Sequence, residues 1–312
     1  MTSSMDAYLV NVDVEKSGFM LGKQVIPKTP EALVEGVDKL VSLPEVCFLV
    51  NDLINDPKTD IEDIGQVISQ DPDLTARLLK LVNSSYYGFN QRVDTVTRAI
   101  LLVGLKELQH MVWASKAVES FTDISPSDAN MASFWRHSIF TAVVARILAR
   151  DRNVLHPERL FVAGLLHDVG RLLIFHRLPE QAAQIISSIK ERSEYEACEI
   201  EQEVLGYDHT QIAHALLTQW QLPPSLVEAI QYHHNPAAAD QAILEASILH
   251  VANIMAHALE IGDEDKLEHT CMGEAWTLLE LTNTRIKPIL HEAVMQFLEA
   301  LELLLPGASQ KL

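Results

Sequence analysis

The pair His167-Asp168, inside the run Leu-Leu-His-Asp-Val-Gly at 165–170, can offer an imidazole nitrogen and a carboxylate oxygen to one metal ion or to two neighbouring ions. Further histidines lie upstream and downstream, each at or near the end of an apolar segment that is typical of a helix. Helices that meet in a bundle can bring such side chains into one cavity. The predicted metal ligands are His137, His167, Asp168, His209, His233 and His234.

Each of these residues has an ordinary structural interpretation when it is taken alone. A single histidine on an apolar helix face, such as His137, belongs more often to a core than to a metal site. An adjacent pair such as His233-His234 is more often the polar end of a helix. Asp168 favours the metal site, because a buried carboxylate needs a cation or several hydrogen-bond donors. Together the six residues predict a centre for one or two ions of zinc, iron or manganese.

A weaker stripe follows in the C-terminal part of the chain. His250, Asn253 and His257 recur at spacings that place all three on one helix face. The stripe fits ligation, and it also fits an ordinary surface or interface, so both interpretations stay open.

The apolar periodicity predicts helices almost throughout, and therefore an all-α fold. Asp60 and Asp71 are the expected N-caps of two early helices, and Pro72 suits a first helical position. A connector at 122–130 is expected to join two helical lobes. The alternating run at 8–14 fits a short strand or an irregular arm. The expected helices are 60–70, 72–82, 95–103, 105–121, 131–150, 157–169, 179–192, 210–220, one from Pro223-Pro224 to His233-His234, 240–261, and two within 270–305 that are split near Pro288.

Composition excludes several function classes. The chain has 312 residues and a net charge of −19, without any run of basic residues, which disfavours nucleic-acid binding. No apolar run approaches the roughly 18–20 residues of a membrane span, and the start lacks the pattern of a signal peptide. Three cysteines far apart indicate neither a disulfide framework nor a paired-cysteine metal site. A cytoplasmic protein without a membrane anchor is the expectation.

Over residues 36–240 the chain resembles the HDOD family, the HD-related output domains of bacterial signalling proteins. The most specific feature is an Asp-Pro-Asp-Leu block at 71–74, followed by Asn83-Ser84 and later by His-Asp-Val-Gly at 167–170. The other matching segments are Leu43-Pro44-Glu45-Val46, Gly104-Leu105, Phe134-Trp135-Arg136-His137, Asp208-His209, the run 220–223, and His233-His234.

The resemblance implies an all-α, two-lobed fold whose second lobe is like the HD phosphohydrolases. His137, His167 and Asp168 match residues that hold one metal in those enzymes. His209, His233 and His234 match the histidines with which the HD-GYP relatives, which cleave cyclic dinucleotides, hold a second metal. The expected organisation is an N-terminal extension at 1–35, an HDOD domain at 36–240 with lobes at 36–121 and 131–240, and C-terminal helices at 241–312 that pack on the HD-like lobe.

Two departures from the enzymes stand out. Where the enzymes carry an aspartate after an apolar residue and an alanine, this chain has Val251-Ala252-Asn253. An amide oxygen can coordinate a metal, but it carries no charge, so Asn253 is expected to be a weak ligand. The Gly-Tyr-Pro motif is also absent after His234. We therefore expect a lower metal affinity than in the enzymes, low enough that the site can be empty. Both departures argue against catalysis.

Two function classes therefore remain. In the first, the chain is a signal-transduction output module with an HD-like site, which acts on a signalling protein in trans or on a small phosphorylated ligand. In the second, it is a metal-dependent phosphohydrolase acting on a nucleotide or cyclic dinucleotide, with Arg171 near the phosphate. Arg171 also fits an ordinary charge at a helix C-terminus.

Overall fold

The computed structural model describes residues 26–35, 45–83, 87, 89, 91–122, 129–192, 196–260 and 273–305. Within these ranges the regular secondary structure is α-helical, apart from one short 3-10 helix, and there is no strand. The all-α prediction is confirmed. The alternating run at 8–14 lies outside the described residues. Among the described helices, none is both long enough and apolar enough to cross a bilayer.

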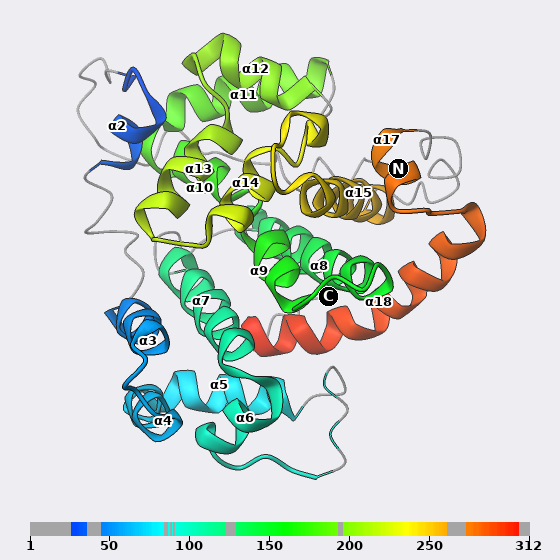
Figure 1. Cartoon of the computed structure of the whole chain (residues 1–312). Coiled ribbons are helices and arrows are strands. Elements are labelled where there is room, and N and C mark those ends of the chain that lie inside the picture. The colour runs from blue at the N-terminus through cyan, green and yellow to red at the C-terminus, as the bar shows by residue number, and fades with distance from the viewer. Residues whose placement is uncertain are drawn as a thin grey trace.

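The first lobe forms the lower part of the molecule in Figure 1. Its early helices begin where local capping predicts. The Asp60 carboxylate accepts from the Asp63 amide at 2.9 Å in a complete capping box, and Asp71 accepts from the Leu74 amide at 2.9 Å. The helices of this lobe are α3 (Glu45–Asn55), α4 (Ile61–Ser69), α5 (Pro72–Val82), α6 (Val96–Val103) and α7 (Leu105–Thr122).

The second lobe is built around one long central helix, α8 (Ala129–Asp151), whose side chains from 137 to 149 are all buried. Helices α9 and α15 pack directly on α8, and α14 packs on both of them. The remaining helices of this lobe are α9 (Glu158–Leu166), α10 (Val169–Arg177), α11 (Pro179–Glu191), α12 (Ala197–Leu205), α13 (His209–Gln219), α14 (Pro224–Gln231) and α15 (Ile243–Glu260). The short α2 (Pro30–Val34) packs on α13.

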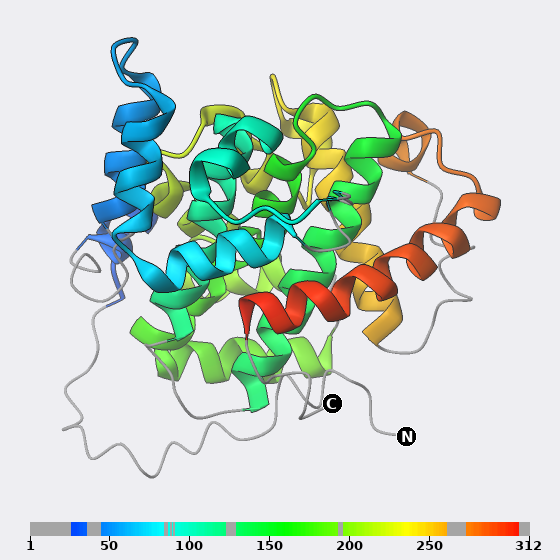
Figure 2. The same cartoon turned by 90° about the horizontal axis from the view of Figure 1, so that it is seen from below.

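The C-terminal helices join the two lobes. Helix α17 (Glu274–Leu278) packs on α15, whereas α18 (Asn283–Leu304) lies along α8 and reaches α5 of the first lobe (Figure 1, Figure 2). The predicted split near Pro288 is wrong, because this proline lies inside α18. The break comes earlier, where Glu280 has a positive φ of 49°.

The break between α9 and α10 is the feature of the fold that positions the site. A continuous helix over 157–169 was expected, but α9 ends at Leu166 and α10 begins at Val169. A Cβ atom on Gly170 would lie 2.0 Å from the His209 carbonyl oxygen, so α10 and α13 touch backbone to backbone there. Helices α2, α3, α10 and α12 were not predicted from the sequence.

Candidate metal centre

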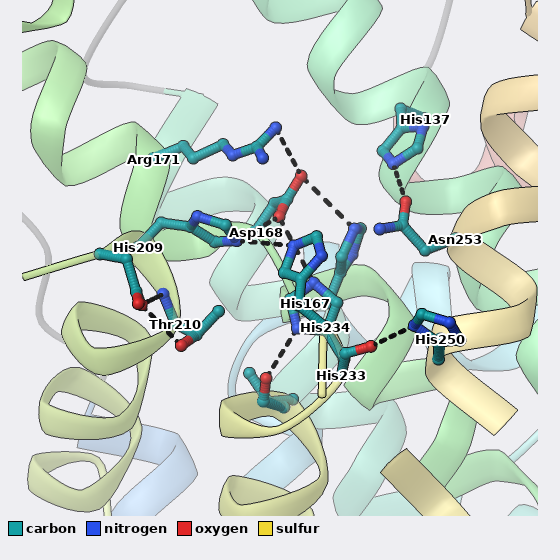
Figure 3. Close-up of polar contacts among 12 residues, drawn as sticks. His137, His167, Asp168, Arg171, His209, Thr210, His233, His234, His250 and Asn253 are labelled. Carbon is teal, nitrogen blue, oxygen red and sulfur yellow. Dashed lines mark hydrogen bonds and ion pairs between the residues drawn. The ribbon is translucent and has the colours of Figure 1, made fainter. Parts of the chain in front are cut away.

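The predicted ligands come from four separate parts of the second lobe (Figure 3). His137 lies on α8, and His167-Asp168 occupies the break between α9 and α10. His209 is the first residue of α13, where Asp208 is the N-cap. The pair at 233–234 follows the end of α14. The structure therefore brings together side chains that are up to 97 positions apart in the sequence, since 234 minus 137 is 97.

One group of donors comprises Asp168, His209, His233 and His234, whose ligand atoms all lie within 4.8 Å of one another. His209 Nε2 is 3.2 Å from Asp168 Oδ1 and 3.2 Å from His234 Nε2. His233 Nε2 lies 3.9 Å from the same carboxylate oxygen. Three imidazoles and one carboxylate are a donor set that zinc, iron and manganese accept.

A second group comprises His137, His167 and Asp168, again within 4.8 Å. His167 Nε2 lies 3.4 Å from Asp168 Oδ2. Asp168 therefore belongs to both groups and presents one oxygen to each side. This arrangement has the donor atoms for one ion or for two neighbouring ions.

Backbone carbonyls fix the orientation of two of these histidines. His167 Nδ1 donates to the Gly164 carbonyl at 2.7 Å, and His233 Nδ1 donates to the Ile230 carbonyl at 2.7 Å. The other nitrogen of each ring, Nε2, then points into the cluster as a lone-pair donor. Neither Nε2 atom has a hydrogen-bond partner in the described part of the chain, although both are buried. Orphaned, preoriented imidazole nitrogens fit a metal ion, because metal-bound histidines are held in this way.

Glu201 supports His209, and the sequence analysis missed it. Its buried carboxylate accepts from the His209 amide at 2.8 Å and from His209 Nδ1 at 2.6 Å. Burial lowers the pKa of His209, but Glu201 outweighs it and raises that pKa to about 9. Glu201 lies on α12, a helix that was not predicted, and its separation of eight positions from His209 carries no recognisable spacing signal.

His167, His233 and His234 are in the neutral form that binds metals. Burial lowers the pKa of His167 to about 4, and it holds the pKa values of His233 and His234 well below the usual range. Asp168 is ionised, because the charge of Arg171 and the hydrogen bond from His209 outweigh the effect of its burial and keep its pKa well below the usual value. These three rings therefore present neutral nitrogens beside one negative carboxylate, whereas His209 must lose a proton before it can bind a metal ion.

Arg171 is buried beside this carboxylate. Its Nη1 lies 3.4 Å from Asp168 Oδ2, and its Nε lies 3.6 Å from Glu201 Oε1. It is the third residue of α10, so its interpretation as a charge at a helix C-terminus is wrong. Its predicted contact with a phosphate group stays a prediction.

Asn253 faces His137 and accepts a hydrogen bond from its Nε2 at 3.0 Å (Figure 3). The other nitrogen of that ring, Nδ1, lies 3.2 Å from Glu260 Oε1. Glu260 was also missed, although it extends the stripe of His250, Asn253 and His257 by one further step on α15. His250 points elsewhere, because its Nδ1 donates to the His233 carbonyl at 2.8 Å.

An all-α bundle that buries a His-Asp pair among converging histidines defines a helical protein of the HD class. Residues 40–236 match the HDOD domain, and the chain belongs to the HDOD family.

Solved structures share this fold. A Shewanella amazonensis protein named as a candidate phosphohydrolase is 26% identical, with a TM-score of 0.69 over 87% of this chain and 96% of that protein. An HDOD protein of unknown function from Geobacter sulfurreducens is 24% identical, with a TM-score of 0.70 over 88% and 97% of the two chains.

Curated relatives are longer than this chain. An uncharacterized protein of Treponema pallidum is 26% identical in an alignment of 274 residues that covers 82% of this chain and 51% of the relative. Bacillus subtilis YuxH, also uncharacterized, is 24% identical over 54% of this chain and 40% of its own length. The chain thus spans about half or less of these relatives.

Proposed function

We propose that this chain is a signalling output module whose HD-type centre holds a divalent metal ion and, through it, binds a small phosphorylated ligand. One observation carries the proposal: the buried Nε2 atoms of His167 and His233 converge on Asp168 without hydrogen-bond partners among the described residues. Orphaned buried nitrogens are costly in free energy unless a ligand engages them. Zinc, iron(II) and manganese(II) all suit these donors.

The residues of the centre have distinct tasks in this proposal. His167, His233 and His234 supply neutral nitrogens, His209 supplies a nitrogen that loses its proton when the metal binds, and Asp168 supplies the negative charge. Glu201 and the carbonyls at 164 and 230 hold the rings in place. When bound, a divalent ion supplies a Lewis-acid centre for phosphate oxygens. Arg171 is proposed as the cation that meets the same phosphate, and a signalling protein in trans as the receiver of the signal.

Hydrolysis of a phosphodiester is the second candidate. The retained donor set favours it, as does the 26% identity to the Shewanella protein. The binding role ranks first because Asn253 adds no negative charge, and its oxygen is engaged by His137 at 3.0 Å. Asp168 is then the only carboxylate in the two donor groups that surround it.

Metal analysis of the purified full chain tests the centre directly. We expect the wild type to hold at least one equivalent of a divalent metal after dialysis, and His233→Asn to lose it. The matched control is His291→Asn, which removes an exposed imidazole on α18 and should leave the metal content unchanged. A wild type that holds no zinc, iron or manganese at saturation contradicts the proposal.

A ligand assay then separates binding from hydrolysis. Linear and cyclic dinucleotides are titrated by calorimetry, and the same mixtures are analysed by chromatography. We expect binding without turnover in the wild type. Asn253→Asp should raise metal content, because a carboxylate binds a divalent cation better than an amide does. Robust wild-type turnover that Asp168→Ala abolishes would establish the phosphohydrolase instead.

A further inference from the structure

A third group of donors lies at the edge of the centre, away from the His-Asp pair. It comprises His137, His257 and Glu260, whose ligand atoms lie within 4.8 Å of one another. The rings of His137 and His257 have centroids 4.3 Å apart. Glu260 Oε1 lies 3.2 Å from His137 Nδ1, and Oε2 lies 3.7 Å from His257 Nδ1. One carboxylate therefore stands between two imidazoles.

We propose that His137, His257 and Glu260 form an additional cation site, for a divalent transition-metal ion such as zinc, beside the HD-type centre. Two histidines and one glutamate are a ligand set that holds zinc with a position left for water or a ligand. The site extends the proposed metal-binding function, but it does not require the HD-type centre to be filled.

The geometry of α15 explains how these side chains meet. Asn253, His257 and Glu260 follow one another at spacings of four and three, so they occupy one face of the helix. That face lies against α8, which carries His137. A carboxylate at 260 thus supplies, two turns further along, the charge that position 253 lacks.

Asn253 gains a specific task in this arrangement. Its Oδ1 lies 3.0 Å from His137 Nε2 and accepts a hydrogen bond from the N–H group of that nitrogen. An imidazole held by Nε2–H to an amide oxygen presents Nδ1 as the lone-pair donor, as metal-bound histidines commonly do with an outer-shell partner. Nδ1 is the atom that faces Glu260. Asn253 is therefore a positioning residue that directs His137 toward the additional site.

Exposure distinguishes this site from the buried centre. The His257 and Glu260 side chains are 24% and 25% exposed, whereas those of His167, His209 and His233 are fully buried. An ion at the additional site is open to solvent on one side, so it should exchange with the medium faster than an ion beside Asp168. The additional site would respond to the metal concentration around the protein.

The inference is tested by measuring the stoichiometry and affinity of zinc binding by equilibrium dialysis on the full chain. The variants are Glu260→Gln and His257→Asn, which are partly exposed and change neither donor group around Asp168. His233→Asn removes a ligand of the buried centre, and His291→Asn is the control. Circular dichroism and thermal unfolding verify that each variant is folded.

We expect Glu260→Gln and His257→Asn each to lose the same zinc equivalent, while the equivalent lost in His233→Asn remains. The affinity should drop by more than the roughly 10–100-fold that loss of an outer-shell partner costs. If both variants bind zinc as the wild type does, the group is only a hydrogen-bonded network and the inference fails, whatever happens in His233→Asn. If zinc is lost in these two variants but not in His233→Asn, the additional site stands and the buried centre fails.

Discussion

Helices α3 to α6 and helices α8 to α15 bury very different side chains. Among the described residues from 26 to 106, no polar or charged side chain is buried. The second lobe, by contrast, buries a His-Asp pair, further histidines, a glutamate and an arginine in one place. Burial of such groups costs free energy unless partners satisfy them. The contrast indicates that helices α3 to α6 are optimised for packing, whereas the second lobe carries a site.

The same substitution in each lobe gives the strongest test of this comparison. Asp168→Asn removes the charge shared by both donor groups, whereas Asp60→Asn keeps a competent helix cap at the surface. We expect the first variant to lose the metal equivalent that His233→Asn also loses, and the second to retain it. Metal analysis after dialysis is the measurement. Equal metal content in the two variants would place the site elsewhere.

Gly170→Ala tests whether the backbone contact between α10 and α13 holds the site together. The added Cβ would meet the His209 carbonyl oxygen at 2.0 Å, and this backbone atom cannot move without α13. We expect a loss of about 3 kcal/mol in the free energy of unfolding, at the upper end of overpacking effects. Chemical denaturation measures it.

Gly206→Ala is the matched control for that variant. Gly206 has a φ of 86°, with open space around an added Cβ, so only backbone strain of roughly 1–2 kcal/mol is expected. If Gly170→Ala costs no more than Gly206→Ala, the close approach does not organise the centre.

His110 on α7, between the two lobes, tests what a buried histidine does outside a metal site. Burial, with further help from His156, Arg159 and Lys106, lowers its pKa to about 4. Between pH 6.5 and 4 the unfolded chain therefore binds a proton that the folded chain does not, and stability falls as the pH falls through this window. The loss is on the order of 3 kcal/mol.

His110→Gln should flatten this dependence relative to the wild type, with both proteins measured by denaturation in the presence of a chelator. Stability curves that stay parallel from pH 7 to pH 4 would show that His110 is not the group responsible.

The parts of the fold that could be predicted from the sequence are those with local signals. Helices α4, α5 and α6 begin at the residues that follow Asp60, Asp71 and Thr95, because a cap acts within three residues of itself. Helix α10 was missed because its boundary depends on the contact with α13, which no local pattern shows.

The candidate site also combines residues that the sequence indicates with residues that only the packing of the helices brings in. The adjacent pair His167-Asp168 is visible in the sequence, and a family resemblance brings in the other histidines. Glu201 and Glu260 were not predicted, because each meets its histidine only across the packing of two helices. Asn253 was expected as a weak ligand, but its contact with His137 could not be anticipated from spacing.

Asp60→Ala gives the smallest expected effect and completes the comparison between the lobes. The variant removes the oxygen that accepts from the Asp63 amide at 2.9 Å, so one N–H group at the start of α4 loses its partner. Loss of an N-cap costs about 1 kcal/mol, and solvent access at this exposed site limits the cost. Thermal unfolding should show a small decrease, which Asp60→Asn largely avoids. Metal content should stay at the wild-type level, because α4 belongs to helices α3 to α6, whose described residues bury no polar side chain. A fall in metal content would mean that the first lobe supports the centre, and it would contradict the contrast between the two lobes.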